Sequence, residues 1–172
     1  MKKMAKAAAL LAAMVLTAAA FAQDFPSYLF MDGTTVIGCK DGLPANILIP
    51  AGVTAIGEKA FYNQYSLTGV VIPEGVTSIG DEAFKYCNSL VEVTIPEGMT
   101  SIGKNAFEAC YNLASVTIPA SVEYIGNIAF SGCPNLTEVK YAGTKAQWEA
   151  IEKWGGIGSG FVVTCTDGAV RL

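Results

Sequence analysis

Hydrophobic positions along the chain recur with a fixed period of 23 residues. Five residue types keep their place in each of four successive units. The columns are Pro50, Pro73, Pro96 and Pro119; Ile56, Ile79, Ile102 and Ile125; Gly57, Gly80, Gly103 and Gly126; Phe61, Phe84, Phe107 and Phe130; and Leu67, Leu90, Leu113 and Leu136. One such unit is too short to offset its own ordering entropy, so it is stable only when stacked on copies. The pattern predicts a repeat solenoid with one continuous core.

Each unit contains one clear strand signal. Between Leu67 and Ile72 the spacing is Leu-x-x-Val-x-Ile, and Val70 and Ile72 alternate as in a strand with one buried face. The proline that follows ends the strand, because it has no N–H for the ladder. We expect the strands to stack in parallel at about 4.8 Å in a single right-handed stack. The Gly-x-x-Ala-Phe column predicts one short helical or 3₁₀ turn per unit, with Phe pointing inward.

The two ends of the repeat region carry different patterns and are interpreted as caps. At the front, β-prone runs at 28–31 and 35–39 flank Asp32-Gly33, which predicts a β-hairpin. At the back, Ala146, Trp148, Ile151 and Trp154 predict an amphipathic helix over 144–153, followed by a final strand over 161–165. The expected divisions are an N-terminal cap at 23–46, the solenoid at 47–141 and a C-terminal cap at 142–172.

The first 22 residues are typical of a cleaved secretion signal. Lys2, Lys3 and Lys6 precede an apolar run over 7–17, and Ala20-Phe21-Ala22 is a small-x-small cleavage site. A membrane anchor is the alternative, but the run is shorter than the roughly 20 residues that span a bilayer. The site has no cysteine to accept a lipid. We therefore expect a secreted, periplasmic or cell-surface bacterial protein that begins at Gln23 and has no membrane span.

The charge of the predicted mature chain argues against two classes of partner. Removing residues 1–22 leaves 8 of the 11 basic residues and all 15 acidic ones, so the net charge becomes −7. Nucleic acids and anionic lipids are poor partners for such a surface.

The repeat resembles a known bacterial family. The combination Ile-Pro-x-x-Val-x-x-Ile-Gly-x-x-Ala-Phe-x-x-Cys-x-x-Leu over residues 47–141 looks like the BspA-type leucine-rich repeats. The segment from Ala142 to Trp148, with the segment from Cys165 to Gly168, also resembles the terminal cap common in that family. The resemblance implies a secreted or surface-displayed protein, with adhesion to host or extracellular-matrix proteins among the roles of some members. Fold alone does not fix function.

The composition offers little for catalysis. The chain contains no histidine, which excludes Ser-His-Asp and Cys-His sites and His-ligated zinc. It also has no phosphate-binding glycine motif, so we expect neither an enzyme nor a cofactor. Two carboxylate columns remain: Glu74 with Glu97, and Glu92 with Glu138. We interpret them as a solvent-exposed rim that the period repeats; the alternatives are a glycosidase-like acid/base pair and a calcium site.

Five cysteines raise the question of disulfides. Cys87, Cys110 and Cys133 share one column, in which Gln64 takes the fourth place. Stacking places them within disulfide range, but their position near a core leucine favours buried reduced thiols. Cys39 and Cys165 fall in opposite caps and should not pair with each other.

Two surfaces are candidates for binding a protein or a glycan. The first consists of the strand residues between the buried ones: Gly69, Val71, Glu92, Thr94, Ser115, Thr117, Glu138 and Lys140. The second is the corner before each strand, which carries Tyr62, Tyr65, Tyr86 and Tyr111; shielding of the core is the alternative role for these rings. The leading hypothesis is an exported binding or adhesion module. The alternative is a structural or self-associating envelope component without a small-molecule ligand.

Overall fold

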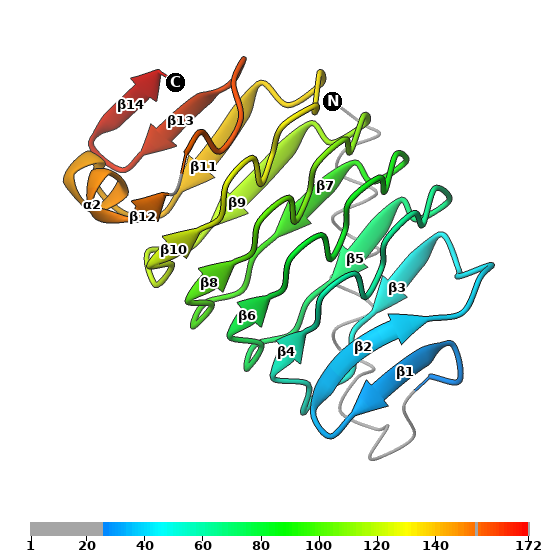
Figure 1. Cartoon of the computed structure of the whole chain (residues 1–172). Coiled ribbons are helices and arrows are strands. Elements are labelled where there is room, and N and C mark those ends of the chain that lie inside the picture. Colours follow the sequence, from blue (N-terminus) through cyan, green and yellow to red (C-terminus); the bar gives the residue numbers. More distant parts are fainter. Residues whose placement is uncertain (1–25, 154, 172) are drawn as a thin grey trace, which may run out of the picture.

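The computed structural model describes residues 26–153 and 155–171. Two parallel stacks of strands run along a solenoid, from the N-terminal hairpin in blue to the C-terminal cap in red (Figure 1). Each stack forms a seven-stranded sheet. The predicted signal sequence, the predicted first mature residue Gln23 and the cap residue Trp154 lie outside the described residues.

One sheet, here called the long-strand sheet, contains the strands that the repeat pattern predicts. Its parallel members are β3 (Asn46–Leu48), β5 (Gly69–Val71), β7 (Glu92–Thr94), β9 (Ser115–Ile118), β11 (Glu138–Tyr141) and β13 (Val162–Cys165). Equivalent repeat positions pair in register, as Val93 does with Val116. The antiparallel strand β14 (Gly168–Arg171) closes the sheet at β13. The prediction of parallel stacked strands is confirmed.

The second sheet, here called the short-strand sheet, does not follow from the sequence pattern. It contains β1 (Leu29–Asp32), β2 (Thr35–Cys39), β4 (Ala55–Ile56), β6 (Ser78–Ile79), β8 (Ser101–Ile102), β10 (Tyr124–Ile125) and β12 (Glu152–Lys153). Four of these strands lie inside the repeats and have only two residues. Two residues are too few for an alternation signal, although the isoleucine column marks the inward position of each.

The segment predicted to form one short helical or 3₁₀ turn forms a 3₁₀-type turn that does not continue into a helix. The N–H of Ala60 donates to the carbonyl of Gly57 at 3.3 Å, which is the i to i+3 bond of a 3₁₀ turn. Lys59 and Asn63 have φ of 57° and 62°, and these left-handed residues interrupt the helix. Phe61 donates its N–H to the next coil at 2.8 Å. The turns therefore stack through hydrogen bonds much as the strands do.

The left-handed position occupied by Lys59 recurs in every unit and provides a stability test at Ile128. The same column holds Glu82, Asn105 and Ile128, with φ of 55°, 57° and 49°. A β-branched residue is strained in this region, whereas Asn adopts it readily. Ile128→Asn should therefore raise the free energy of unfolding by about 1 kcal/mol. Urea denaturation measures the change, and Ile128→Val is the matched control because it keeps the branched Cβ. Equal stability of the two variants would show that backbone strain at this position is negligible.

The phenylalanine column forms the centre of the core. Phe61, Phe84, Phe107 and Phe130 are buried, and neighbouring rings stack face to face with centroids 5.0, 5.2 and 5.5 Å apart. Phe161 of the C-terminal cap meets Phe130 edge-on at 6.4 Å. The prediction of an inward-pointing Phe in each unit is confirmed. The core is one aromatic ladder through the length of the repeats.

The glycine column brings the backbones of neighbouring coils into contact. A Cβ built on Gly80, Gly103 or Gly126 would lie 2.7, 2.5 or 2.4 Å from a backbone atom of the preceding coil. Such distances are far below van der Waals contact. Glycine recurs in these units because no side chain fits at the crossing.

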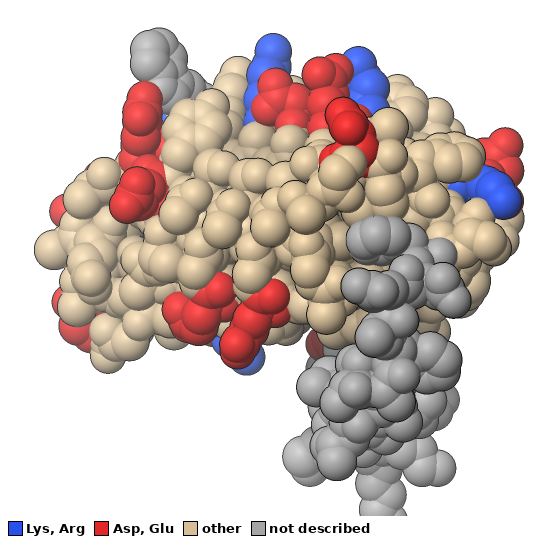
Figure 2. Space-filling model, turned by 90° about the horizontal axis from the view of Figure 1, so that it is seen from below, with Lys and Arg blue, Asp and Glu red and all other residues tan. Residues whose placement is uncertain are grey.

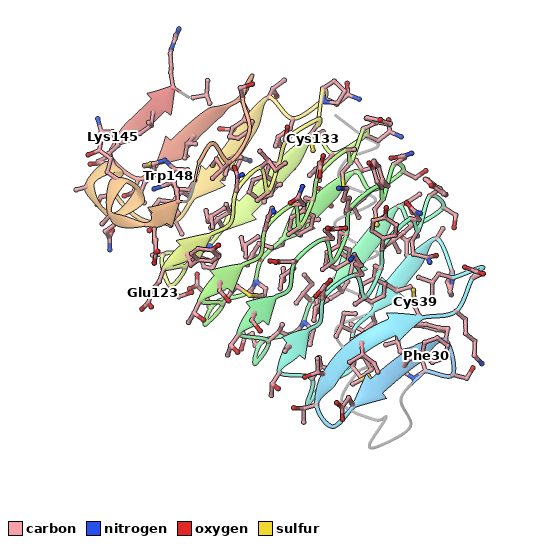
Figure 3. The ribbon with its side chains drawn as sticks, viewed as in Figure 1. Phe30, Cys39, Glu123, Cys133, Lys145 and Trp148 are labelled. Carbon is pink, nitrogen blue, oxygen red and sulfur yellow. The ribbon has the colours of Figure 1, made fainter. Side chains whose placement is uncertain are left out.

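The N-terminal cap is an antiparallel hairpin, as the sequence predicts. Strands β1 and β2 pair from Leu29 with Cys39 to Asp32 with Thr35, and the register shifts between Phe30 and Met31. Strand β2 then pairs in parallel with β4, so the cap continues the short-strand sheet. Phe30 and Ile37 are about half exposed on this hairpin, and Figure 3 labels Phe30 at the N-terminal end of the stack.

The C-terminal cap contains a shorter helix than the sequence predicts. Helix α2 (Lys145–Ala150) begins at a capping box in which Thr144 and Gln147 satisfy each other's backbone N–H groups. It ends before β12, where the chain rejoins the stack. Trp148 is buried with its ring 5.3 Å from that of Tyr141, but Ala146 is exposed and does not belong to the predicted apolar face. The strand predicted over 161–165 is β13, but it is not the final strand, because β14 follows it and pairs with it antiparallel.

Candidate binding surface

The eight predicted strand residues lie side by side in two columns on the outside of the long-strand sheet. The first column contains Gly69, Glu92, Ser115 and Glu138, and the second contains Val71, Thr94, Thr117 and Lys140. Each strand alternates a buried core residue with these partly or fully exposed ones. Glu92 pairs with Ser115 and Thr94 with Thr117 in the ladder, so neighbouring residues of a column are one strand apart.

Both columns extend by one strand at each end. Asn46 and Leu48 of β3 pair with Gly69 and Val71, and Val162 and Thr164 of β13 pair with Glu138 and Lys140. The hydroxyl of Thr164 donates to Oε1 of Glu138 at 2.7 Å. These four residues were missed because they lie outside the four complete 23-residue units. The apolar residues Ile47 and Val163, which are buried like Val139, mark the inward positions between them.

The face formed by these twelve residues, here called the strand face, is small in side-chain volume and mainly polar. The hydroxyls of Thr94 and Thr117 form no hydrogen bond to another described residue. Charged groups are few: Glu92, Glu138 and Lys140. A flat array of hydroxyl, amide and carboxylate groups can hydrogen-bond to an extended partner, although it offers no aromatic anchor.

Exposed threonines that precede the strands of the short-strand sheet hydrogen-bond within the molecule. Thr77, just before β6, donates to the carbonyl of Thr54 at 3.2 Å, and Thr100, just before β8, donates to that of Thr77 at 3.0 Å. Seen from below the view of Figure 1, charged side chains form small groups separated by uncharged surface (Figure 2). The strand face is the candidate binding surface because its outward columns continue across six parallel strands.

The four predicted tyrosines do not form one patch. Tyr62 and Tyr86 contact each other edge-on with centroids 5.7 Å apart, and Nζ of Lys85 lies 5.2 Å from the Tyr86 ring centroid. These two rings are partly buried and act in part as the predicted shield of the core. Tyr65 and Tyr111 are 55% and 49% exposed.

An ion pair holds the partly buried end of this corner. Nζ of Lys85 lies 2.8 Å from Oε2 of Glu108, and the side-chain amide of Asn105 donates to the same oxygen. The hydrogen bond with Glu108 raises the pKa of Lys85. Burial opposes ionisation of Glu108, but its bonds with Lys85 and Asn105 outweigh burial and lower the pKa of the carboxyl. These contacts give Lys85 and Glu108 a structural role, because each charged group already has its partner in the other.

The cysteine column contains reduced thiols. All five cysteines are free, which confirms the preference for unpaired buried thiols. Cys87, Cys110 and Cys133 each donate Sγ–H to the phenylalanine carbonyl of the preceding coil at 3.2, 3.1 and 3.2 Å. Figure 3 labels Cys39 near the N-terminal hairpin, while Cys165 belongs to β13 at the other end. The column is a hydrogen-bond ladder that ties each coil to the one before it.

Burial makes these thiols resist ionisation, which predicts a loss of stability in alkaline solution. Burial raises the pKa of Cys87 to about 12 and that of Cys133 to about 11, and raises that of Cys110 as well. An unfolded thiol ionises at about 8.5. Their stabilising contribution is therefore complete below that pH and is lost as the pH rises toward the folded values.

The test compares urea unfolding at pH 8 and pH 10 for the unmodified protein and for Cys110→Ala. Each buried thiol lowers the free energy of unfolding by at most about 1.4 kcal/mol for each pH unit above its unfolded pKa. Between pH 8 and pH 10 we therefore expect Cys110→Ala to lose about 2 kcal/mol less of its free energy of unfolding than the unmodified protein loses. The same loss in both proteins would show that Cys110 ionises as easily in the folded state as in the unfolded chain.

The two predicted carboxylate columns do not form a metal-binding cluster among the described residues. Glu74 and Glu97 are exposed, and Glu92 and Glu138 flank Ser115 on the strand face. Within residues 26–153 and 155–171, no group of three or more His, Cys, Asp or Glu side chains is placed to hold a metal ion. In the same part of the chain, no helix has the length and apolarity needed to cross a membrane.

The two sheets, the stacked 23-residue coils and the leucine and phenylalanine columns define a leucine-rich-repeat solenoid. The family model of the BspA type leucine rich repeat region matches residues 45–151 with six copies. The chain therefore belongs to the BspA-type leucine-rich-repeat family. The matched residues include the parallel strands β3, β5, β7, β9 and β11, whereas β13 lies beyond them. The match confirms the family resemblance.

Solved bacterial structures share this fold. A leucine-rich cell surface protein of Faecalibacterium prausnitzii is 29% identical with a TM-score of 0.59, over 71% of this chain and 38% of its own. A leucine-rich repeat protein of Eubacterium ventriosum is 30% identical with a TM-score of 0.60, over 65% and 30%. One from Bacteroides capillosus is 39% identical with a TM-score of 0.59, over 67% and 91%. This chain thus spans about a third of the first two. No curated protein matches it significantly.

Proposed function

We propose that this protein is an exported, non-catalytic binding module that recognises a host or extracellular protein or glycan through the strand face, with protein as the better fit. The observation that carries the proposal is the continuity of that face. Two columns of small, mainly polar residues run in register across six parallel strands. An extended partner segment can hydrogen-bond along such an array over a long distance, which compensates for the weakness of each contact.

An extracellular or surface location fits this role. Residues 1–22 have the three regions of a secretion signal, and the similar protein of Faecalibacterium prausnitzii is a cell surface protein. The predicted mature chain has a net charge of −7, which favours neutral or basic partners over nucleic acid and anionic lipid. Adhesion is the form of binding that suits a protein displayed outside the cell.

A catalytic role has no support from the side chains present. The chain has no histidine, and burial raises the pKa of all five of its thiols, so they are poor nucleophiles. The carboxylates of the strand face lie on an open surface and lack the burial that tunes an acid/base pair.

A binding screen tests the proposal directly. Purified protein is titrated over surfaces coated with matrix proteins such as collagen, fibronectin and laminin, with mucin, and with immobilised glycans. We expect saturable binding to at least one coated protein that weakens little with salt, because the strand face is only sparsely charged. Signals that never saturate, or no binding on any surface, would contradict the proposal.

Self-association is a second candidate, and the exposed end of the hairpin favours it. Phe30 and Ile37 expose apolar surface at the N-terminal cap, and β1 and β3 are the outer strands of the two sheets at this end. Exposed edges and apolar residues together promote pairing between chains. Sedimentation would show dimers that Phe30→Ser disrupts, whereas a monodisperse monomer at high concentration would exclude this candidate.

A further inference from the structure

The exposed corner before strands β5 and β9 carries two exposed tyrosine rings. Among the described residues, five large hydrophobic side chains are clearly exposed: Tyr65 at 55% and Tyr111 at 49% lie in this corner, and Val91 at 48% immediately precedes β7. The other two, Phe30 and Ile37, belong to the N-terminal hairpin. The grouping is not explained by the core, which is complete beneath it.

The repeat sets the distance between the two exposed tyrosine rings. Tyr65, Asn88 and Tyr111 occupy the same position in three successive coils, because they are 23 residues apart. With coils about 4.8 Å apart, the two tyrosine positions are separated by about 9.6 Å along the solenoid axis. The smaller Asn88 lies between them. The corner therefore presents two aromatic rings with a lower polar step in the middle, here called the tyrosine notch.

The backbone of the notch is firmly held. The N–H of Tyr65 donates to the carbonyl of Asn63 at 2.9 Å, and the N–H of Asn88 donates to that of Tyr86 at 2.9 Å. The side-chain amide of Asn135 donates to the carbonyl of Tyr111 at 2.7 Å. A surface that is already ordered loses little entropy when it binds a ligand.

The polar groups of the notch are uncharged and incompletely satisfied. The side chains between and beside the tyrosines are Ser66, Asn88, Ser89 and Asn112. The side-chain oxygen of Asn88 is buried and has no hydrogen-bond partner among the described residues.

We propose that the tyrosine notch binds a neutral, extended, β-linked polysaccharide that lies along the solenoid axis. Sugar rings of such a chain present flat C–H faces that stack on tyrosine and hydroxyl groups that hydrogen-bond to amides. The separation of the two tyrosine positions is close to the length of one disaccharide in an extended β-1,4-linked chain, so alternate sugars would meet Tyr65 and Tyr111. The sugar between them would lie over Asn88. This site is separate from the strand face and does not depend on the function proposed for that face.

The chemistry of the notch favours a glycan over a protein. Protein partners are held by apolar anchors that enter dry pockets, whereas these rings stand on an open corner beside hydroxyl and amide groups. The absence of charge at 65–66, 88–89 and 111–112 argues for a neutral ligand on a chain that is acidic overall.

The experiment titrates the full purified protein with chitotetraose, cellotetraose and the corresponding disaccharides by calorimetry, with saturation-transfer NMR on the same samples. We expect at least one tetrasaccharide to bind, and its disaccharide to bind about ten-fold more weakly because it reaches only one ring. Tyr65→Ala and Tyr111→Ala should each weaken tetrasaccharide binding about ten-fold. Tyr65→Phe and Tyr111→Phe keep the rings and should bind nearly as well as the unmodified protein.

Separate outcomes test this site and the strand face. Thr117→Arg, on the strand face, should leave tetrasaccharide binding unchanged. The proposal is overturned if neither tetrasaccharide binds, or if the alanine variants bind as tightly as the unmodified protein. It is also overturned if Tyr65→Ala and Tyr111→Ala instead abolish binding to a coated, unglycosylated protein, which would assign the notch to a protein partner. Circular dichroism of each variant verifies that the fold is intact.

Discussion

Phe107→Ala should lower the free energy of unfolding by about 3 to 5 kcal/mol, the range for removing a buried aromatic ring. Phe107 is fully buried, and its ring stacks on Phe84 at 5.2 Å and on Phe130 at 5.5 Å. Its loss leaves a cavity in the middle of the ladder and removes both ring contacts. Because each coil is stable only through its neighbours, a gap at mid-stack weakens the interfaces on both sides.

Phe130→Ala is the matched comparison for this prediction. Phe130 is equally buried, but one of its two ring partners is the edge-on Phe161 at 6.4 Å, near the end of the stack. We expect its loss to fall at the lower end of the same range. Urea unfolding followed by circular dichroism measures both. Equal destabilisation would count against coupling through the stack, and a larger effect at Phe130 would place the weakest interface at the C-terminal cap.

Gly103→Ala should destabilise the protein by about 3 kcal/mol, although it adds only one methyl group. A Cβ at this position would lie 2.5 Å from the carbonyl carbon of Gly80 and 2.6 Å from the backbone nitrogen of Asp81. These are backbone atoms, so no side chain can move aside to relieve the clash. The coils must separate instead, which also stretches the bond from Lys104 N–H to the Asp81 carboxylate.

Gly156→Ala controls for the change of residue type. Gly156 is exposed, has no atom within 4 Å of the position that a Cβ would occupy, and does not lie in the left-handed region of φ. Alanine there should change stability by less than about 0.5 kcal/mol. If Gly103→Ala were equally mild, the close approach of neighbouring coils would not be a constraint on the fold.

Much of the fold could be predicted because the repeat multiplies a weak signal. A single Val-x-Ile alternation such as Val70 and Ile72 is ambiguous, but four copies in register leave one architecture. The short-strand sheet escaped prediction because strands such as Ser78–Ile79 are too short for any periodicity. The left-handed residues escaped because Lys59 and Tyr86 are not residue types that signal positive φ.

The sequence located eight residues of the strand face on the outside of the sheet but missed the four residues at its two ends. Alternation with Val93 and Val116 located Glu92, Thr94, Ser115 and Thr117 on the outside of the sheet. Its extension into β3 and β13 was missed because both strands lie outside the four complete units, where the repeat columns are incomplete. The split of the tyrosines into a partly buried pair and an exposed pair depends on turn geometry, which the period alone does not determine.

The role of the strand face is tested by comparing Thr117→Arg with Ser101→Arg in the binding screen. Thr117 lies on β9, the middle strand of the long-strand sheet, and Ser101 lies on β8, one strand from the middle of the short-strand sheet. Both are partly exposed hydroxyl residues at mid-stack, so the same bulky charge tests one face against the other. We predict that Thr117→Arg weakens binding to the coated protein or glycan identified in the screen at least about ten-fold. Ser101→Arg should leave the same binding unchanged. Loss of binding with Ser101→Arg alone would contradict the assignment of the strand face.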